Sequence, residues 1–437
     1  MSANPLKPSQ RERLLAAMTH VASSVGYTDV SIADLTSRAR VSRQTFYEQF
    51  DDKEDLFLAA YRQSERRVLG ELERAIGSSD WWETPHAAVQ AILAQTAQDP
   101  ESTWLLFVEG LAGGPRIAAE RRRVLKAFES RTEDFLDHAP AGGMTLDIPP
   151  TALLGAIRAA AIRSIAPWQL RIDTATAGLP ELGEDLVAWI RSYALPGGQA
   201  RWSSGRHALL PARSVSSAGP ILARHDSLPR GRHSLPRGVV ERNRRERIIH
   251  ATAEVIQAKG YAAVTISDIM AAAGTGKHIF YEHFTDKRHV FAVAQQHAAQ
   301  ETFTACARAY FSQPTWPQRI YAGLRTLTQF IAAEPALAHL QIVAPYAAGA
   351  EAIERAQQMM TMFTVFLEEG YSHRPQAREL PYLCSSAIVD AVFEILREQI
   401  AAGQASKLPR HVPRLAYIAI APFTGPQAAV ELIEGLG

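Results

Sequence analysis

The sequence predicts an all-α protein built from two tandem copies of one helical unit, and three observations lead to this fold class. Apolar residues recur at helical spacing in the segments that carry any regular pattern. A stretch near the N-terminus is repeated far downstream in the chain. The length of 437 residues exceeds what one hydrophobic core organises, so more than one domain is expected.

The repeat aligns residues 11–57 with residues 245–291 without a gap, and 18 of the 47 paired positions are identical. A weaker likeness continues downstream, where the stretch beginning at Asp99 resembles the stretch beginning at Glu334. Each copy spans about 195 residues, which is far longer than a solenoid repeat. The chain is therefore expected to hold a duplicated pair of domains.

Helix signals subdivide each repeated segment. A stripe of apolar residues begins at Leu14 and ends before Gly26, a typical helix stop. Ser31 precedes Asp34 by three residues, and Thr265 precedes Asp268 in the same way, which predicts a capping box in each copy. A short helix over residues 43–50, capped by Ser42, and a fourth helix starting at Lys53, capped by Asp52, complete the pattern.

A tight turn between the second and third short helices is typical of a helix-turn-helix. Phe46 and Phe50 lie four residues apart, so they share the face that packs on the other helices. Polar side chains at the start of the third helix then stay outside and fit the major groove of DNA. The helix starts themselves favour phosphate, because free N–H groups point outward there.

The two phrases "FYEQFDDKEDLF" and "FYEHFTDKRHVF" resemble the DNA-binding signature of the tetracycline-repressor (TetR/AcrR) family. This resemblance covers about 47 residues per copy, and the rest of each copy matches only in being helical. It implies two tandem TetR-like units, each with an N-terminal three-helix head and a helical-bundle ligand or dimerisation domain. Chains with two such units are a minority variant of the family.

The resemblance implies DNA contacts at matching positions of the two heads. The predicted contacts of the first head are Ser31, Ser42, Arg43, Gln44, Thr45, Tyr47, Gln49 and Lys53. Those of the second head are Thr265, Gly276, Lys277, His278, Ile279, Tyr281, His283 and Lys287. The first three residues of each recognition helix are the candidates for reading bases. The candidates for phosphate are Tyr47, Gln49 and Lys53 in the first head and Tyr281, His283 and Lys287 in the second.

Departures from the family pattern carry further hypotheses. Arg40 stands where the turn usually has glycine, so that turn is expected to be either strained or differently shaped. Gly276 stands where the first head has the capping Ser42, which is expected to weaken the start of the second recognition helix by roughly a few tenths of a kcal/mol. The reading faces are Arg-Gln-Thr and Lys-His-Ile, so the two heads are expected to prefer different half-sites.

These signals divide the chain into five parts: a first head (residues 1–60), a first bundle (61–195), a linker (196–240), a second head (241–294) and a second bundle (295–437). The linker is rich in Arg, Ser, Pro and Gly and shows no hydrophobic period. Residues 196–245 hold ten arginines against two acidic residues. Two interpretations of this charge stay open: a soluble tether, or an arm that contacts DNA.

The bundles supply the effector hypothesis. The family resemblance implies a lipophilic small-molecule effector that releases a repressor from its operator. The aromatic residues proposed to line an apolar pocket are Trp104, Phe107 and Trp168 in the first copy and Tyr346 and Phe363 in the second. The competing interpretation is that these side chains are ordinary bundle core.

The sequence also argues against several other classes of protein. The segment containing Lys277 lacks the remaining residues of a phosphate loop, and no zinc-binding spacing of His or Cys occurs, so neither an enzyme, a cofactor nor a metal is expected. Two cysteines, no membrane-length apolar run and no signal peptide predict a cytoplasmic protein. The expected partner is double-stranded operator DNA read as an imperfect palindrome; a low-specificity architectural DNA binder is the alternative. An intramolecular pseudo-dimer and a homodimer with four heads are both compatible with the sequence.

Overall fold

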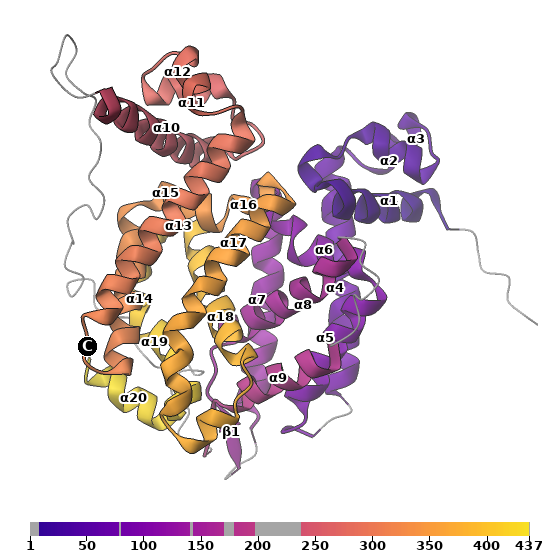
Figure 1. Ribbon diagram of the computed structural model, residues 1–437. Coiled ribbons are helices and arrows are strands. Elements are labelled where there is room, and N and C mark those ends of the chain that lie inside the picture. The colour runs from indigo at the N-terminus through magenta and orange to yellow at the C-terminus, as the bar shows by residue number, and fades with distance from the viewer. Residues whose placement is uncertain (1–7, 78–79, 140–142, 170–178, 197–236, 437) are drawn as a thin grey trace, which may run out of the picture. The chain divides into compact units, whose positions relative to one another are not determined.

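The computed structural model describes residues 8–77, 80–139, 143–169, 179–196 and 237–436, and this part of the chain is almost wholly helical (Figure 1). Its one sheet is a two-stranded antiparallel pair, β1 (Met144–Leu146) with β2 (Ala194–Pro196). The predicted all-α class is confirmed. The predicted linker falls almost entirely on residues 197–236, which lie outside the described residues.

Two series of helices follow the two copies of the sequence. The first series is α1 (Gln10–Val25), η1 (Tyr27–Asp29), α2 (Ile32–Ala39), α3 (Arg43–Gln49), α4 (Lys53–Ile76), α5 (Thr84–Gln98), α6 (Pro100–Phe107), η2 (Glu109–Leu111), α7 (Pro115–Asp137), α8 (Pro150–Gln169) and α9 (Leu179–Arg191). The second series is α10 (Arg237–Lys259), α11 (Ile266–Ala273), α12 (Lys277–His283), α13 (Lys287–Phe311), α14 (Trp316–Ala333), α15 (Pro335–Ile342), α16 (Pro345–Ala348), α17 (Ala350–Met362), η4 (Phe363–Ser372), η5 (Pro375–Glu379), α18 (Leu383–Ala401), η6 (Ala405–His411), α19 (Val412–Thr424) and α20 (Pro426–Glu434).

Each head is a trio of short helices around a small apolar core. In the first head the side chains of Leu14, Leu35 and Phe46 have no exposed surface. In the second head the same is true of Ile248 and Phe280. Truncating a buried phenylalanine of this kind to alanine costs about 3–5 kcal/mol. The predicted face of Phe46 therefore holds the recognition helix on the other two helices.

Long helices continue each head into its bundle. α4 starts in the first head and α13 starts in the second, and Figure 1 shows each running on beside helices of its own bundle. Because α4 and α13 belong to both parts, a shift of the bundle helices is passed to the head along a continuous backbone. α10 begins at Arg237, a few residues before the predicted start of the second head, because the helical pattern continues back through Val240.

The chain divides into two compact units that differ from the predicted bundle boundary. Unit 1 comprises residues 1–140 and 156–190, and unit 2 comprises residues 141–155 and 191–437. Parts of the predicted first bundle, including β1 and β2, therefore belong to the unit that contains the whole second copy. Within unit 2 the Tyr193 hydroxyl donates to the Ile418 carbonyl at 2.7 Å, and the Tyr417 hydroxyl donates to Asp147 Oδ2 at 3.0 Å.

Candidate nucleic-acid interface

The start of each recognition helix is built as the sequence predicts. Ser42 caps α3, and its Oγ accepts from the Thr45 N–H at 3.0 Å. Gly276 stands at the same place before α12 and makes no side-chain cap. The first N–H groups of α12 therefore lack the acceptor that Ser42 supplies in the first head, and they can bond water or phosphate.

The outer face of α3 presents a cationic and polar surface. Arg43, Gln44, Tyr47 and Gln49 are all exposed, and Tyr47 is 49% exposed. The Tyr47 ring meets Phe46 edge-on with 5.3 Å between ring centroids, so the buried phenylalanine orients the exposed phenol. The Arg43 guanidinium lies over the exposed Tyr47 ring, 6.0 Å from its centroid.

The amide of Gln44 and the hydroxyl of Thr45 are already engaged within the first head. Gln44 Nε2 donates to a carboxylate oxygen of Glu48 at 3.0 Å. The hydroxyls of Thr45 and Ser42 lie 2.9 Å apart. Both groups can exchange these local bonds for a base or a phosphate, whereas Arg43 has to give up no hydrogen bond of this kind.

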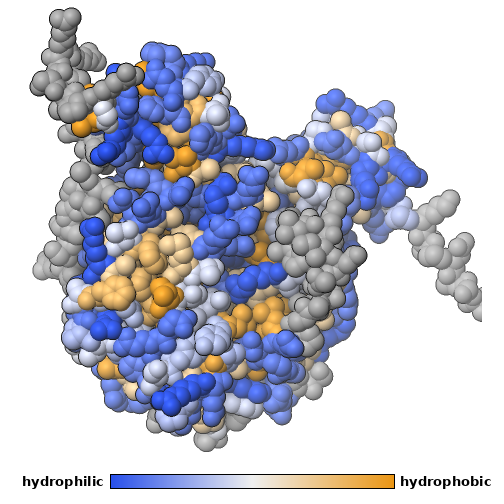
Figure 2. Space-filling model, in the orientation of Figure 1, coloured by the Kyte–Doolittle hydropathy of each residue, from blue (hydrophilic) through white to orange (hydrophobic). Residues whose placement is uncertain are grey.

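The outer face of α12 is smaller than expected. Lys277, His278 and Tyr281 are exposed, with Tyr281 at 59%. Ile279 is only 8% exposed and belongs to the apolar core of the second head, so its side chain does not face outward as a base contact requires. His283 is half-buried beside Phe284, with 6.2 Å between ring centroids. Hydrophilic residues predominate over the visible face of both heads (Figure 2).

Lys53 and Lys287, which pair in the repeat alignment, hydrogen-bond within their own heads. Lys53 Nζ donates to the Tyr27 carbonyl at 3.1 Å and to the Val30 carbonyl at 2.9 Å, and Lys287 Nζ donates to the Tyr261 carbonyl at 3.1 Å. Burial lowers the pKa of Lys53. An ammonium has three N–H donors, so Lys53 keeps one for phosphate. These bonds tie the start of α4 to the turn after α1, and the phosphate contact of the two lysines stays a prediction.

Ser31 and Thr265 form the predicted capping boxes. The Asp34 N–H donates to Ser31 Oγ at 3.2 Å while the Asp34 carboxylate accepts from the Ser31 N–H at 3.0 Å. Asp268 and Thr265 repeat both bonds at 3.2 and 2.9 Å. Both hydroxyls donate to these carboxylates. A phosphate bound at either helix start would have to compete with a carboxylate.

The carboxylate of the second capping box, Asp268, has an additional charged partner. Lys259 Nζ donates to Asp268 Oδ1 at 2.6 Å. Together with the bonds from Thr265, this ion pair lowers the pKa of Asp268 far below its usual range. The hydrogen bonds from Ser31 lower the pKa of Asp34 as well.

The turn before each recognition helix has the same backbone in both heads. Arg40 adopts φ 52° and ψ 50°, and Gly274 adopts φ 61° and ψ 39°. Among the described residues, Arg40 is the only non-glycine with a positive φ. The turn at this arginine is therefore strained rather than differently shaped, since a side chain disfavours this left-handed region.

Two arginines that the sequence interpretation passed over support this turn. Arg13 Nη1 donates to the Arg40 carbonyl at 3.3 Å, and Arg247 Nη2 donates to the Ala273 carbonyl. The signal for them was present, because Arg13 and Arg247 are identical partners in the repeat alignment.

The aromatic residues proposed for an effector pocket lie in different places. Phe363 lines an apolar cavity of the second bundle. Tyr346 lies under the Arg397 guanidinium, 5.2 Å from the ring centroid. Trp104 and Phe107 are buried in unit 1, and the side chain of Trp168 lies outside the described part of the structure.

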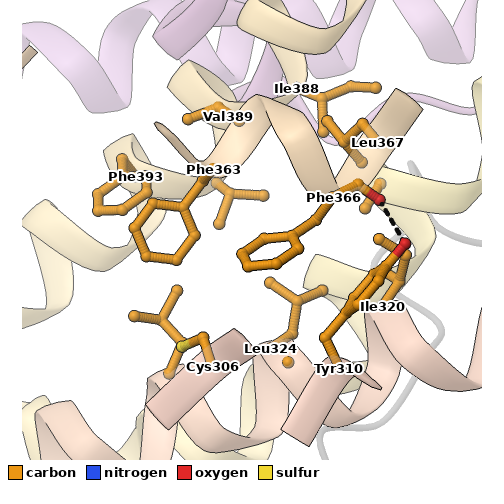
Figure 3. Close-up of a pocket in the computed structure, with 14 residues that line it drawn as sticks. Cys306, Tyr310, Ile320, Leu324, Phe363, Phe366, Leu367, Ile388, Val389 and Phe393 are labelled. Carbon is orange, nitrogen blue, oxygen red and sulfur yellow. Dashed lines mark hydrogen bonds between the residues drawn. The ribbon is translucent and has the colours of Figure 1, made fainter. Parts of the chain in front are cut away.

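The apolar cavity lies within the second bundle, between helices of unit 2. Its walls come from α13, α14, η4, α18 and α19, and Figure 3 shows Phe363, Phe366 and Phe393 turned toward its interior. The remaining lining residues are Cys306, Tyr310, Ile320, Gly323, Leu324, Leu327, Leu367, Ile388, Val389, Val392 and Ala419.

Polar groups at the cavity wall are already satisfied or neutral. The Tyr310 hydroxyl donates to the Phe366 carbonyl at 3.2 Å, and Trp316 Nε1 donates to the same oxygen at 2.9 Å. Burial raises the pKa of Cys306 to about 12, which keeps its thiol uncharged. The cavity therefore suits an uncharged apolar ligand.

The described residues offer neither a metal site nor a membrane span. No three His, Cys, Asp or Glu side chains in these ranges come together to hold an ion. None of the helices in the part described here combines the length and hydropathy that crossing a bilayer requires.

Comparison with known proteins identifies the two heads. The family described as "Bacterial regulatory proteins, tetR family" matches residues 14–60 and 248–294. The HTH-type transcriptional regulator BetI of Brucella anthropi is 32% identical over 137 residues, which cover 30% of this chain and 67% of that protein. The chain belongs to the tetR family of bacterial regulatory proteins. Both matched segments coincide with a head, so it is a tandem tetR-family regulator and binds DNA.

Other relatives match over shorter spans. BetI of Brucella canis is 31% identical over 108 residues, covering 23% of this chain and 53% of that protein. The HTH-type transcriptional activator FasR of Mycolicibacterium smegmatis is 26% identical over 132 residues, covering 30% of this chain and 59% of FasR. Among solved structures, the fatty acid degradation regulator FadR from Bacillus halodurans aligns at 15% identity with a TM-score of 0.35, covering 44% of this chain and 97% of FadR.

Proposed function

We propose that this tetR-family chain is a repressor that reads an imperfect palindrome with two unlike heads and leaves it when a lipophilic molecule binds the second bundle. The observation that carries this proposal is the pair of recognition helices. They share one turn geometry and one buried phenylalanine, yet Arg43 and Gln44 face outward from one and Lys277 and His278 from the other.

Unlike reading faces imply unlike half-sites. Arg43 matches the two acceptors of guanine, while Lys277 offers one flexible ammonium and His278 an imidazole. With Ile279 buried, the second head reads with fewer side chains than the first. We therefore expect the half-site of the second head to be the more degenerate of the two.

The internal pairing of the two copies is supported by contacts within unit 2. Residues of the first copy (141–155 and 191–196) fall in the same compact unit as the second copy. A Cβ on Gly155 would lie 2.6 Å from Glu394 Cβ, so the second turn of α8 packs directly on α18. Together with the buried Tyr193–Ile418 and Asp147–Tyr417 bonds, this favours an intramolecular pseudo-dimer over a homodimer.

The cavity supports a mechanism for release. It encloses about 60 Å³, which is well below the ~150 Å³ of an apolar cavity known to bind benzene. A lipophilic effector therefore has to push the walls apart, and α13 is one of those walls. Because α13 starts in the second head, a ligand that fits only the expanded bundle shifts that head away from its DNA-binding position.

The proposal is tested by selecting duplexes from a random pool with the full chain and then adding 1-decanol as an uncharged apolar probe. We expect a selected site with two unequal halves about one helical turn, ~35 Å, apart, bound by one chain, and released by the alcohol. Two identical half-sites, or a complex that always holds two chains, would contradict the proposal. Equal retention of unrelated duplexes would point instead to an architectural DNA binder.

A further inference from the structure

A buried carboxylate joins the first head to the first bundle. Glu109 begins η2 and is only 4% exposed. Its Oε2 accepts from the Tyr27 N–H of the head at 2.7 Å, and its Oε1 accepts from Trp104 Nε1 of α6 at 2.9 Å. One side chain of the bundle therefore holds the backbone of the head at the turn that follows α1.

The same turn is held from the other side by α4. Lys53 Nζ donates to the Tyr27 carbonyl and lies 4.6 Å from the centroid of the Tyr27 ring. The Tyr27 N–H is therefore bonded to Glu109 of the bundle, and its carbonyl is bonded to Lys53 at the start of α4. A displacement of Glu109 moves Tyr27, and through Lys53 it moves the start of α4.

The junction leaves little room for Glu109 to move alone. A Cβ on the next residue, Gly110, would lie 2.7 Å from Tyr61 Cε2, which is closer than real side chains approach. Because η2 packs against α4 without a gap, the two elements shift together rather than past each other.

The second copy has no such carboxylate. Alignment of the stretches that begin at Asp99 and Glu334 pairs Glu109 with Ala344 and Trp104 with His339. Ala344 is 4% exposed and belongs to the apolar cluster of the second head. The second copy keeps the bond from Lys287 Nζ to the Tyr261 carbonyl.

We propose that Glu109 is a positioning residue through which the first bundle sets the orientation of the first head on DNA, and that the second head lacks this control. The inference rests on the proposed reading of two half-sites by two heads. It deepens that function by making the two heads respond to different signals.

The chemistry of Glu109 supplies a signature for this role. Burial raises the pKa of Glu109 to about 7, the bonds from Tyr27 and Trp104 oppose the rise, and Asp29 adds to it. The closed junction favours the protonated carboxyl, so ionisation above this pH weakens the hold of the bundle on the head. Since the pKa is raised above its ordinary value, the folding stability from this group is full below ~4.5 and is lost as pH rises through about 7.

Other charged and titratable groups also face this junction. On the head side they are Lys53, Asp29, Asp52 and Glu54, and His20 of α1 is bonded to Glu101 of α6 at 2.7 Å. Tyr61 of α4 stays neutral because burial raises its pKa further. Arg158 of α8 donates to the Phe107 carbonyl at 3.5 Å, and arginine stays charged throughout.

The test compares footprints of the full chain and of Glu109→Gln at pH 6 and pH 8 on a duplex selected by the wild-type protein. Wild type should lose several-fold, on the order of fivefold, in occupancy of the first head's half-site from pH 6 to pH 8 relative to Glu109→Gln. Occupancy of the second head's half-site should be the same for both proteins at each pH. Glu101→Gln, an α6 variant that removes the bond to His20 at the same helix, serves as the matched control.

A second variant separates positioning from folding. Trp104→Phe keeps the ring and removes one N–H that favours the ionised carboxylate, so the midpoint of the pH effect should move upward from about 7. An identical ratio between the half-sites for wild type and Glu109→Gln at both pH values would overturn the inference, as would an unmoved midpoint in Trp104→Phe. If wild type selects no duplex, the proposed function fails first and this inference fails with it.

Discussion

Replacing Arg40 with glycine should stabilise the first head. Arg40 closes α2 at φ 52°, where an L-residue costs about 1–2 kcal/mol, while glycine adopts this region freely. Glycine also adds roughly 0.5–1 kcal/mol of unfolded-state entropy that folding must remove. The net gain is therefore about 0.5–1 kcal/mol. The backbone bonds of the turn are unaffected, since Val41 N–H still donates to the Thr36 carbonyl at 3.1 Å.

The second head supplies the reverse experiment. Gly274 has the same conformation and its turn the same bonds, with the Thr275 N–H donating to the Met270 carbonyl at 3.1 Å. A Cβ at Gly274 would also lie 3.1 Å from Arg247 Nη2, which has to move. Gly274→Ala should therefore destabilise the second head by about 1 kcal/mol or more.

Hydrogen exchange of the full chain measures both effects locally, which suits a protein of several domains better than one global melting curve. Peptides from α2 and α3 should exchange roughly two- to fivefold more slowly in Arg40→Gly, and those from α11 and α12 about fivefold faster in Gly274→Ala. Arg40→Ala is the control, because it removes the guanidinium and keeps the strained backbone. Equal exchange in Arg40→Gly and Arg40→Ala would refute the reasoning.

Three further changes follow from the same geometry. Arg43→Ala should weaken binding by about 1–3 kcal/mol and relax preference at one base pair, seen by titrating single-base variants of the selected duplex; unchanged preference would count against the assigned contact. Val392→Phe should fill the cavity and abolish thermal stabilisation by 1-decanol, while Val365→Phe, at an exposed site on η4, should leave it intact. Asp268→Asn should lower protection of the second head more at pH 7 than at pH 2: the depressed pKa of Asp268 gives stability that is present in full above its ordinary value and declines as pH falls below it. A difference that persisted undiminished at pH 2 would rule that origin out.

Local chemistry made much of the heads predictable. The caps at Ser31, Ser42 and Asp52, and the inward face of Phe46, depend on residues within one or two turns of each other, and the structure has all of them. The strain at Arg40 was also predictable, because one residue in the turn departs from glycine.

Contacts between distant segments were not predictable in the same way. Lys53 begins a helix, which suggested phosphate, but its ammonium reaches carbonyls more than twenty residues earlier in the chain. Ile279 was placed outward by analogy with Thr45. In the second head both Ile279 and Phe280 are buried, because moving a branched apolar side chain from water into the core lowers the free energy. The partner of Glu109 is 82 positions away in sequence, and no local pattern marks such a pair.

A hydroxyl-radical footprint of the full chain on its selected duplex tests the central claim, that both recognition helices read DNA with unlike faces. We expect two protected half-sites, of which Arg43→Ala weakens only one and Lys277→Ala only the other. Loss of the same half in both variants, or no protection of any duplex at low ionic strength, would contradict this account of the protein.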